Sequence, residues 1–242
     1  MIFIELNGEK IMTNIKDNLD KIKTEVFRTA KSCDRQTDSV RLITVSKKKS
    51  VQVIKEAIKA GAKNFGENYI QEAIEKIDII ANDSVTWHFI GHLQSNKAKF
   101  AVKYFEYIHT VDKLKLAKEI NKQAKKINKI QKILLQVNIG EELTKSGARI
   151  ENAIELVKQI HEFENISIQG LMCMPPYFTE PEKARIYFKQ LVQIKEKILE
   201  QNFDNVSMEH LSMGMSNDFK VAIEEGSTMV GVGTSIFGNR AI

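Results

Sequence analysis

Short apolar runs alternate with amphipathic stretches along almost the whole chain, and this alternation constrains the fold more than any other feature. Each run is short, rich in β-branched or aromatic residues, and bounded by polar or turn residues, which is typical of strands buried in a parallel sheet. The expected strands are 42–47, 63–66, 85–90, 107–111, 132–138, 166–174, 206–211 and 228–232. Parallel pairing follows, because a helix between two strands returns the chain to the same edge of the sheet.

The stretches between these runs carry apolar residues three or four positions apart, which is the spacing of one helix face. A further amphipathic helix precedes the first strand, with Thr13 or Asn14 as its N-cap. Its expected buried face consists of Ile15, Leu19, Ile22, Val26 and Ala30. Ser50 is expected to cap the helix after the first strand, and Gly61 to end it in a left-handed conformation.

Eight strand–helix units in one chain of 242 residues predict a single closed (β/α)8 TIM barrel, for which roughly 250 residues are typical. The N-terminal helix can complete the ring of helices. We therefore expect one barrel domain over residues 13–242 and an extension over 1–12. Residues 1–11 show no clear helix or strand pattern and Met12 opens the first helix, so we hypothesise that the first eleven residues are dispensable.

Composition excludes several classes of protein. Two cysteines, Cys33 and Cys173, are too few for a disulfide framework or a zinc site, and Cys173 lies in an apolar run that predicts a buried position. No apolar run reaches the roughly 18 residues of a membrane span, and the N-terminus does not resemble a secretory signal. A cytoplasmic location is the expectation. The net charge of +5 suits a small anionic ligand.

The run 113–132 holds eight lysines and raises the question of nucleic-acid binding. Its apolar residues form one helical stripe, namely Leu116, Ile120, Ala124 and Ile127. The lysines occupy the remaining faces and no aromatic residues are interleaved with them, which favours a solvated helix surface over a nucleic-acid groove.

The first strand ends at Lys47, and strand alternation places its side chain on the same face as Ile43 and Val45. An ammonium at the end of a buried strand is costly without a partner, and desolvation lowers a lysine's pKa, which makes the amine nucleophilic and able to form a Schiff base. The alternative is a run of three solvated lysines, Lys47 to Lys49, at a strand end.

Two loops near the C-terminus combine glycine with hydroxyl residues. They are 212–218, after the seventh strand, with Ser216 or Asn217 as cap of the next helix, and 233–238, after the eighth, before a possible short helix. The loops after strands seven and eight usually form the phosphate site of such barrels, because backbone N–H groups and helix N-termini favour anions. With Lys47 on the same face of the barrel, these loops predict a site for a phosphate-bearing aldehyde.

The pair His88 and His92 does not make a metal site. Residues four apart on a strand are separated by about 13 Å, which is too far for one ion. We expect His88 to pack in the core and His92 to make a loop contact.

Several segments resemble the pyridoxal phosphate homeostasis protein family over residues 13–238. They are Val45-Ser-Lys47, Phe65-Gly-Glu-Asn-Tyr69, Trp87-His-Phe-Ile-Gly-His-Leu-Gln-Ser-Asn-Lys97, Lys145-Ser-Gly147, Gly170-Leu-Met172, Leu211-Ser-Met-Gly-Met-Ser216 and Gly233-Thr-Ser-Ile-Phe-Gly238. The resemblance implies a barrel like the N-terminal domain of alanine racemase. It also implies pyridoxal 5′-phosphate (PLP) held as an internal aldimine and a role in supplying or buffering this cofactor.

By the same resemblance, Lys47 is the Schiff-base lysine, and the phosphate is held by Ser212, Ser216, Gly233 and Thr234. Asn68, Met213 and Lys145 are further candidate cofactor-binding residues, with Lys145 as a second amine that relays the aldehyde outward.

Two positions depart from the family pattern. Gly231 stands where the family usually has an arginine facing the pyridine nitrogen, so ring electronics or affinity are expected to differ. Ser50 stands where a proline is common.

The favoured function is a PLP carrier without its own turnover, which delivers the cofactor to apo PLP-dependent enzymes and is a monomer or a dimer. Racemisation needs a base on each side of the substrate's Cα, and racemases take one from an additional domain that we expect this chain to lack. The alternatives are a racemase-like or decarboxylase-like PLP enzyme, a Schiff-base aldolase, and a basic protein that binds RNA or a partner.

Overall fold

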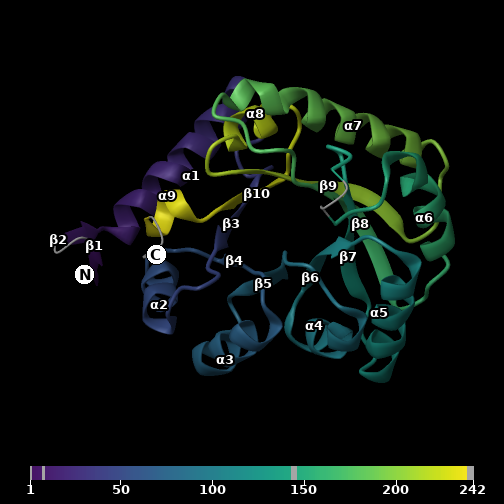
Figure 1. The fold of residues 1–242 in the computed structure, drawn as a ribbon, viewed down its shortest axis with the longest axis horizontal. Coiled ribbons are helices and arrows are strands. Elements are labelled where there is room, and N and C mark those ends of the chain that lie inside the picture. Colours follow the sequence, from purple (N-terminus) through teal and green to yellow (C-terminus); the bar gives the residue numbers. More distant parts are fainter. Residues whose placement is uncertain (1, 7–8, 143–145, 239–242) are drawn as a thin grey trace.

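The computed structural model describes residues 2–6, 9–142 and 146–238, and within them eight parallel strands close into a barrel (Figure 1). Their order around the barrel is β10-β3-β4-β5-β6-β7-β8-β9. The strands are β3 (Arg41–Val45), β4 (Asn64–Glu67), β5 (Thr86–Phe89), β6 (Tyr107–Val111), β7 (Gln131–Val137), β8 (Ile166–Cys173), β9 (Val206–Met215) and β10 (Met229–Val232). The predicted single (β/α)8 barrel is confirmed.

Helices surround this barrel and cover the outward faces of its strands (Figure 1). They are α1 (Ile15–Ser32), α2 (Val51–Lys59), α3 (Ile70–Ile80), α4 (Ala98–Tyr104), α5 (Leu114–Lys126), α6 (Ala153–Ile160), α7 (Arg185–Leu199), α8 (Phe219–Glu224) and α9 (Thr234–Phe237). Short 3-10 turns precede three of these helices, at Ser95–Lys97, Ile150–Asn152 and Pro181–Ala184.

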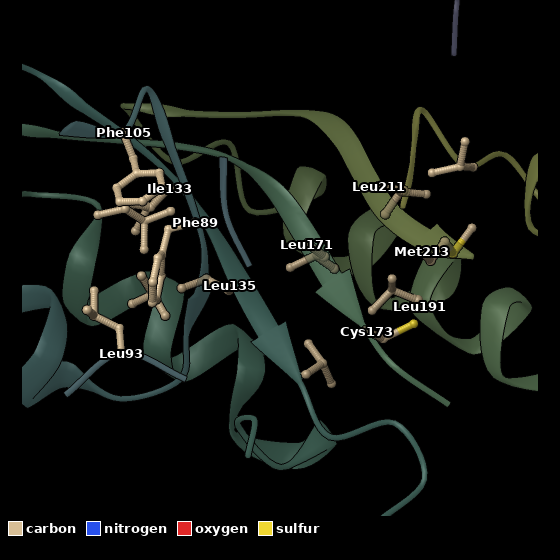
Figure 2. Packing of buried hydrophobic residues seen from close by; sticks show 14 of the residues in the cluster. Phe89, Leu93, Phe105, Ile133, Leu135, Leu171, Cys173, Leu191, Leu211 and Met213 are labelled. Carbon is tan, nitrogen blue, oxygen red and sulfur yellow. The ribbon is translucent and has the colours of Figure 1, made fainter. Parts of the chain in front are cut away.

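The main hydrophobic core lies between the barrel and the helices (Figure 2). Phe89 and Phe105 pack edge to face there, and Leu191 of α7 lies in the same core as Leu211 of β9. Cys173 is buried as predicted. Burying one large apolar side chain stabilises a fold by roughly 1.5–3 kcal/mol, so this continuous layer holds strands and helices in fixed positions.

A second, separate apolar cluster is formed by Ile43, Tyr107, Leu134, Met172 and Met229, which come from five different strands. Residues on the inward faces of barrel strands meet in this way and fill the interior. The barrel is therefore a packed core, and a ligand can be held only at one of its mouths.

Helix α1 begins as predicted, with Asn14 as the N-cap, its side chain accepting a hydrogen bond from the Asp17 amide at 3.2 Å. All five residues of its expected apolar face are buried. The helix completes the ring beside α8, α9 and α2, and the Asn18 side-chain amide donates to the carbonyl of Ile236 in α9 at 3.0 Å.

The expectation for the N-terminal extension was wrong in one respect. Residues Ile2–Leu6 (β1) and Glu9–Thr13 (β2) form an antiparallel hairpin, in which Leu6 pairs with Glu9. Met12 belongs to this hairpin and does not open α1. The two runs are joined in the sequence by Asn-Gly, a hairpin signal that outweighs the weak alternation of the runs themselves. That residues 1–11 are dispensable, and that the barrel domain starts at 13, stay predictions.

Strand β9 is longer than predicted, because Ser212 to Met215, expected in a loop, continue the strand. Ser212 pairs with Met229 and Met215 with Gly231 of β10, so the ladder itself extends this segment. Ser216 and Asn217 do not cap the next helix, which has Asp218 as its N-cap residue. Strand β3 in contrast ends earlier, at Val45, so that Lys47 lies in the following turn.

Helix α5 carries the lysine-rich run, with Leu116, Ile120 and Ala124 buried as predicted. The prediction that Ile127 belongs to the same stripe is wrong, because its side chain is 51% exposed. Ile127 is the C-cap residue, where the helix ends and no longer directs the side chain toward the buried face. Across the described parts of the chain, no helix has both the length and the apolar character that crossing a bilayer requires.

Candidate functional site

A cavity of about 320 Å³ opens at the C-terminal ends of the strands. Its size is at the lower end of the roughly 300–1,000 Å³ of small-molecule sites. Seven of the eight sequence-predicted site residues line it, namely Lys47, Asn68, Ser212, Met213, Ser216, Gly233 and Thr234. Lys145 lies outside the described residues. Ile43 and Val45 line the same cavity as Lys47, in agreement with the expected alternation.

The cavity has two walls of different construction. One, the lysine wall, consists of Val45, Lys47, Lys49 and Asn68, which lie at or just after the ends of strands β3 and β4. The other, the loop wall, consists of residues 212–216 at the end of β9 together with Gly231, Gly233 and Thr234 around the end of β10.

A buried ion pair fixes the backbone that precedes Lys47. The Lys76 ammonium donates to Glu67 Oε1 and to the carbonyl oxygen of Ser46, both at 2.8 Å, and the Ser46 hydroxyl donates to the same Glu67 oxygen at 2.6 Å. Glu67, Lys76 and Ser46 are all buried. Burial raises the pKa of the Glu67 carboxyl, and the hydrogen bonds from Lys76 and Ser46 oppose that rise.

The same network reaches the residue after Lys47. Lys76 also pairs with Glu72, whose carboxylate accepts a hydrogen bond from the backbone amide of Lys48. Lys48 has a φ of +60°, in the left-handed region that costs a non-glycine residue conformational energy. We call Ser46, Glu67, Glu72 and Lys76 the clamp, because together they hold the backbone on both sides of Lys47.

Asn68 is held in place by an unusually close approach of the backbone. A Cβ atom at Gly91 would lie 2.1 Å from the Asn68 carbonyl oxygen, so that only glycine fits, and the Thr110 hydroxyl donates to the Gly91 carbonyl at 2.6 Å. The Oδ1 atom of Asn68 is buried and has no hydrogen-bond partner among the residues that the structure describes. A buried acceptor of this kind is costly unless a ligand donates to it.

The loop wall is held by hydrogen bonds and by close packing at a glycine. The Gly233 amide donates to Ser216 Oγ at 3.4 Å and so joins the two loops, while the Met215 amide donates to Asp218 Oδ1 at 2.6 Å. Gly214 has a φ of +95°, and a Cβ there would lie 2.6 Å from the Cβ of Ala222 in α8. Position 214 in β9 therefore requires glycine, for its conformation as well as for the close packing of α8.

The two walls meet at Val45. A Cβ at Gly233 would lie 3.1 Å from the Val45 carbonyl oxygen, which brings the end of β10 against the strand that leads to Lys47. At Gly231 the corresponding distance is 3.5 Å, to Val45 Cγ2, an ordinary van der Waals contact. Position 231 therefore has room for a Cβ atom, although this sequence has none there.

The histidines lie as predicted. His88 is fully buried, stacks on Tyr107 and hydrogen bonds through both ring nitrogens, whereas His92 bonds to Ser146 Oγ at 3.1 Å in a loop contact. Within the described ranges, no group of three or more His, Cys, Asp or Glu side chains is placed to hold a metal ion.

Sequence reasoning missed the clamp and the buried histidine His109, which bonds to both His88 and Ser212. The clamp had a signal in the sequence: Lys76 falls on the inward face of α3, three and six positions after the buried Ala73 and Ile70. A lysine on a buried helix face needs a carboxylate partner, and Glu67 stands nine positions before it, at the end of β4.

The arrangement suits a small molecule that carries both a carbonyl group and an anionic group. Lys47 supplies an amine, and the loop wall supplies hydroxyls and backbone N–H groups within the same cavity. Hydroxyl and amide donors next to glycine are the groups that bind phosphate in barrels of this type.

Comparisons with known proteins agree on one family. The family model described as alanine racemase, N-terminal domain, matches residues 14–241. The chain is 40% identical to the pyridoxal phosphate homeostasis protein of Aquifex aeolicus, over 94% of this chain and 99% of that protein. It is 36% identical to the Escherichia coli protein of the same name, over 95% and 98% of the two chains.

Solved structures give the same result. PipY of Synechococcus elongatus superposes with a TM-score of 0.84 without PLP and 0.82 with PLP bound, at 33% and 32% identity, covering 93% of this chain and all of PipY. Clostridium difficile alanine racemase, at 17% identity and a TM-score of 0.72, shares the fold; this chain covers 57% of it. The chain belongs to the pyridoxal phosphate homeostasis protein family, within the alanine racemase N-terminal domain family.

Proposed function

We propose that this protein binds PLP, with Lys47 joined to the aldehyde as a Schiff base and the loop wall holding the phosphate. The observation that carries the proposal is the placement of Lys47 and the loop wall around one cavity. The PLP-bound structure of PipY, at 32% identity over nearly the whole chain, supports it. Lys47 would supply the amine for this bond, whose formation from an amine and an aldehyde releases one water molecule.

The residues present fit this cofactor. The buried Asn68 Oδ1 offers an acceptor on the lysine wall, and Ser212, Ser216 and the amide of Gly233 offer hydrogen-bond partners on the loop wall. The clamp holds the amine-bearing turn rigid, which lowers the entropy lost when the adduct forms. Gly231 leaves the pyridine nitrogen without a guanidinium neighbour from that position.

We further propose that the protein stores or delivers PLP for cellular homeostasis and does not turn over a substrate. Tyr177, which lines the mouth, is 74% exposed, so the cavity is open to water. An open site protects carbanion intermediates poorly, whereas it lets a cofactor enter and leave. The curated relatives carry a homeostasis name in each organism compared. Apo PLP-dependent enzymes are the proposed recipients.

The direct test is a visible absorption spectrum of the purified protein after PLP is added, followed by borohydride reduction and peptide mapping. We expect an aldimine band and a modified peptide that contains Lys47. Lys48→Ala is the matched control, because Lys48 is exposed and does not line the cavity. Modification elsewhere, or no band at saturating PLP, would refute the assignment.

The absence of turnover is tested by incubating the PLP-loaded protein with single L-amino acids and following chirality and product release. Steady racemisation or decarboxylation that is lost in Lys47→Ala would make the protein an enzyme. Delivery is tested by adding PLP-loaded protein to an apo-enzyme and measuring the recovery of its activity. Lys145→Ala is expected to slow this transfer, and an unchanged rate would exclude a role for Lys145.

A further inference from the structure

A row of hydrogen-bonded side chains runs through the barrel interior from one mouth to the other. The row begins at Asn64, which lines a second cavity at the N-terminal mouth of the barrel. Asn64 Oδ1 is 3.2 Å from His88 Nε2. His88 Nδ1 is 2.9 Å from His109 Nε2, and His109 Nδ1 is 2.9 Å from the Ser212 hydroxyl. The row thus ends on a residue of the loop wall.

Both histidines are fully buried and hold a single proton each. Burial is the main cause that lowers the pKa of His88 well below its ordinary value and that of His109 to about 3, and nearby His210 and Arg41 lower both further. Each neutral ring has one N–H donor and one bare acceptor nitrogen. The donor of each ring is therefore fixed by what its neighbours donate or accept.

The Asn64 amide sets the direction of the whole row. With Oδ1 toward His88, His88 must donate from Nε2, so its bare Nδ1 accepts from His109 Nε2–H. The bare Nδ1 of His109 then accepts the hydroxyl proton of Ser212. In this first form Ser212 has no proton left for a ligand and offers only lone pairs.

Rotating the Asn64 amide by half a turn gives a second form with the same number of protons, provided that each ring loses its Nε2 proton and gains one at Nδ1 by exchange along the row and with water at its two ends. The amide nitrogen then donates to His88 Nε2, His88 donates from Nδ1, and His109 donates from Nδ1 to Ser212 Oγ. This frees the Ser212 hydroxyl to donate to a phosphate oxygen. A phosphate dianion favours the second form, because its oxygens accept a hydrogen bond from the Ser212 hydroxyl and are repelled by lone pairs.

We propose that Asn64, His88 and His109 are positioning residues that switch Ser212 between these two forms, and that a bound phosphate group selects the second. The inference rests on the proposed role of Ser212 in holding the phosphate of PLP. It extends the site to two buried histidines and to an asparagine at the opposite mouth of the barrel.

The test reads the ring protons directly by ¹⁵N NMR of the full chain labelled at histidine. We expect both rings to be protonated at Nε2 without phosphate and at Nδ1 with PLP or saturating inorganic phosphate. Pyridoxal, which lacks the phosphate, should leave the first form in place. Rings that stay protonated at Nε2 with PLP bound, or that are at Nδ1 from the start, would overturn the inference.

A variant measures the effect on affinity. Asn64→Asp presents only acceptor atoms to His88 and locks the first form, so PLP should bind about tenfold or more weakly, as for a lost charge-assisted hydrogen bond, while pyridoxal binding is unchanged. Asn82→Asp is the matched control, since Asn82 lines the same cavity at the N-terminal mouth and its side-chain oxygen accepts hydrogen bonds from Ser84, outside the row. Equal affinity for PLP in both variants would contradict the proposal.

Two further measurements keep the outcomes distinct. In Ser212→Ala, which removes the end of the row, phosphate should no longer change the ring protonation of His109; a persisting change would count against the relay. Thermal unfolding verifies that each variant is folded. If neither PLP nor pyridoxal alters the absorption spectrum, the proposed function fails. The titration with inorganic phosphate would still show whether a phosphate group changes the ring protonation of His88 and His109.

Discussion

The two walls of the cavity are stabilised by different interactions, the lysine wall by buried charges and the loop wall by neutral polar groups. The lysine wall holds one amine in place through buried charges, with Lys76 bonded to two carboxylates and a backbone carbonyl within the clamp. The loop wall relies on hydroxyls, backbone amides and glycines, and the buried carboxylate next to it, Asp218, accepts a hydrogen bond from the Met215 amide. A covalent bond needs an exact position of one atom, whereas an anion is held by several weak donors that adjust to it.

Removing the Lys47 amine should have the largest effect on PLP binding, and it tests whether the two walls bind their groups independently. Lys47→Ala is expected to abolish the aldimine band completely, because no bond can form at that position. Inorganic phosphate should still bind, since the loop wall is untouched. Absorption spectra and phosphate titration by calorimetry measure the two effects. Loss of phosphate binding in this variant would show that the walls do not act separately.

Breaking the clamp should damage the fold as well as the lysine wall. Lys76→Met leaves Glu67 buried without its cation, and removing one partner of a buried pair typically costs about 3–5 kcal/mol. Urea unfolding measures the loss. Glu67→Gln in the same chain should recover part of it, because no charge is then buried; a double variant as unstable as Lys76→Met would contradict this reading.

The same variant predicts a pH dependence. The pKa of Glu67 is already raised above 4.5 by burial, and losing Lys76 raises it further. A carboxyl whose pKa is higher in the folded state is favoured there in its protonated form, so its contribution to stability falls as pH rises through that pKa. The deficit of Lys76→Met relative to the parent protein should therefore be smaller near pH 4.5 than at pH 7. A deficit that is constant across this range would exclude Glu67 as its source.

Removing a single hydroxyl group from the loop wall should have a smaller effect on PLP binding. Ser216→Ala removes a hydroxyl that accepts from the Gly233 amide, and we expect PLP affinity to fall by roughly 5–30-fold, as for one hydrogen bond. Pyridoxal should be affected less, because it lacks the phosphate. Ser235→Ala is the control, since Ser235 is exposed in the same segment and does not line the cavity. Equal effects of the two variants on PLP binding would contradict a specific role for Ser216.

The smallest effect is expected where the walls meet. Gly231→Arg places a side chain in a position with room for its Cβ, 3.5 Å from Val45 Cγ2. Affinity should change by less than about tenfold, while the absorption band shifts because a guanidinium disfavours protonation of the ring nitrogen. A spectrum identical to that of the parent protein would show that the arginine does not reach the nitrogen.

Much of this molecule follows from local sequence patterns. The apolar periodicity of α1 predicted its five buried residues, and the short apolar runs predicted all eight barrel strands. Seven of the eight residues named from the family resemblance line one cavity, and that they bind PLP stays a prediction. The helix face and the strands that were confirmed share a cause, since each depends on a pattern that is continuous in the sequence.

What could not be predicted depends on partners far apart in the sequence. The extension of β9 through Met215 requires the neighbouring strand β10, and the row from Asn64 to Ser212 joins four strands. His88 looked like a satisfied core histidine, which it is, yet its bond to His109 is visible only once β5 and β6 pair. Periodicity identifies which face is buried but does not reveal which polar groups meet there.

The hydrogen bond from Asn18 to the carbonyl of Ile236 ties the first helix of the barrel to the last. A ribosome releases Asn18 long before the segment 233–238, so the loop wall can assemble only after all eight strands have been synthesised. In the proposed site, an emerging chain would present its amine early but would hold the phosphate only after α9 has docked on α1. Stable cofactor binding would thus require that translation has passed residue 237. A prematurely terminated chain would bind little of the cofactor.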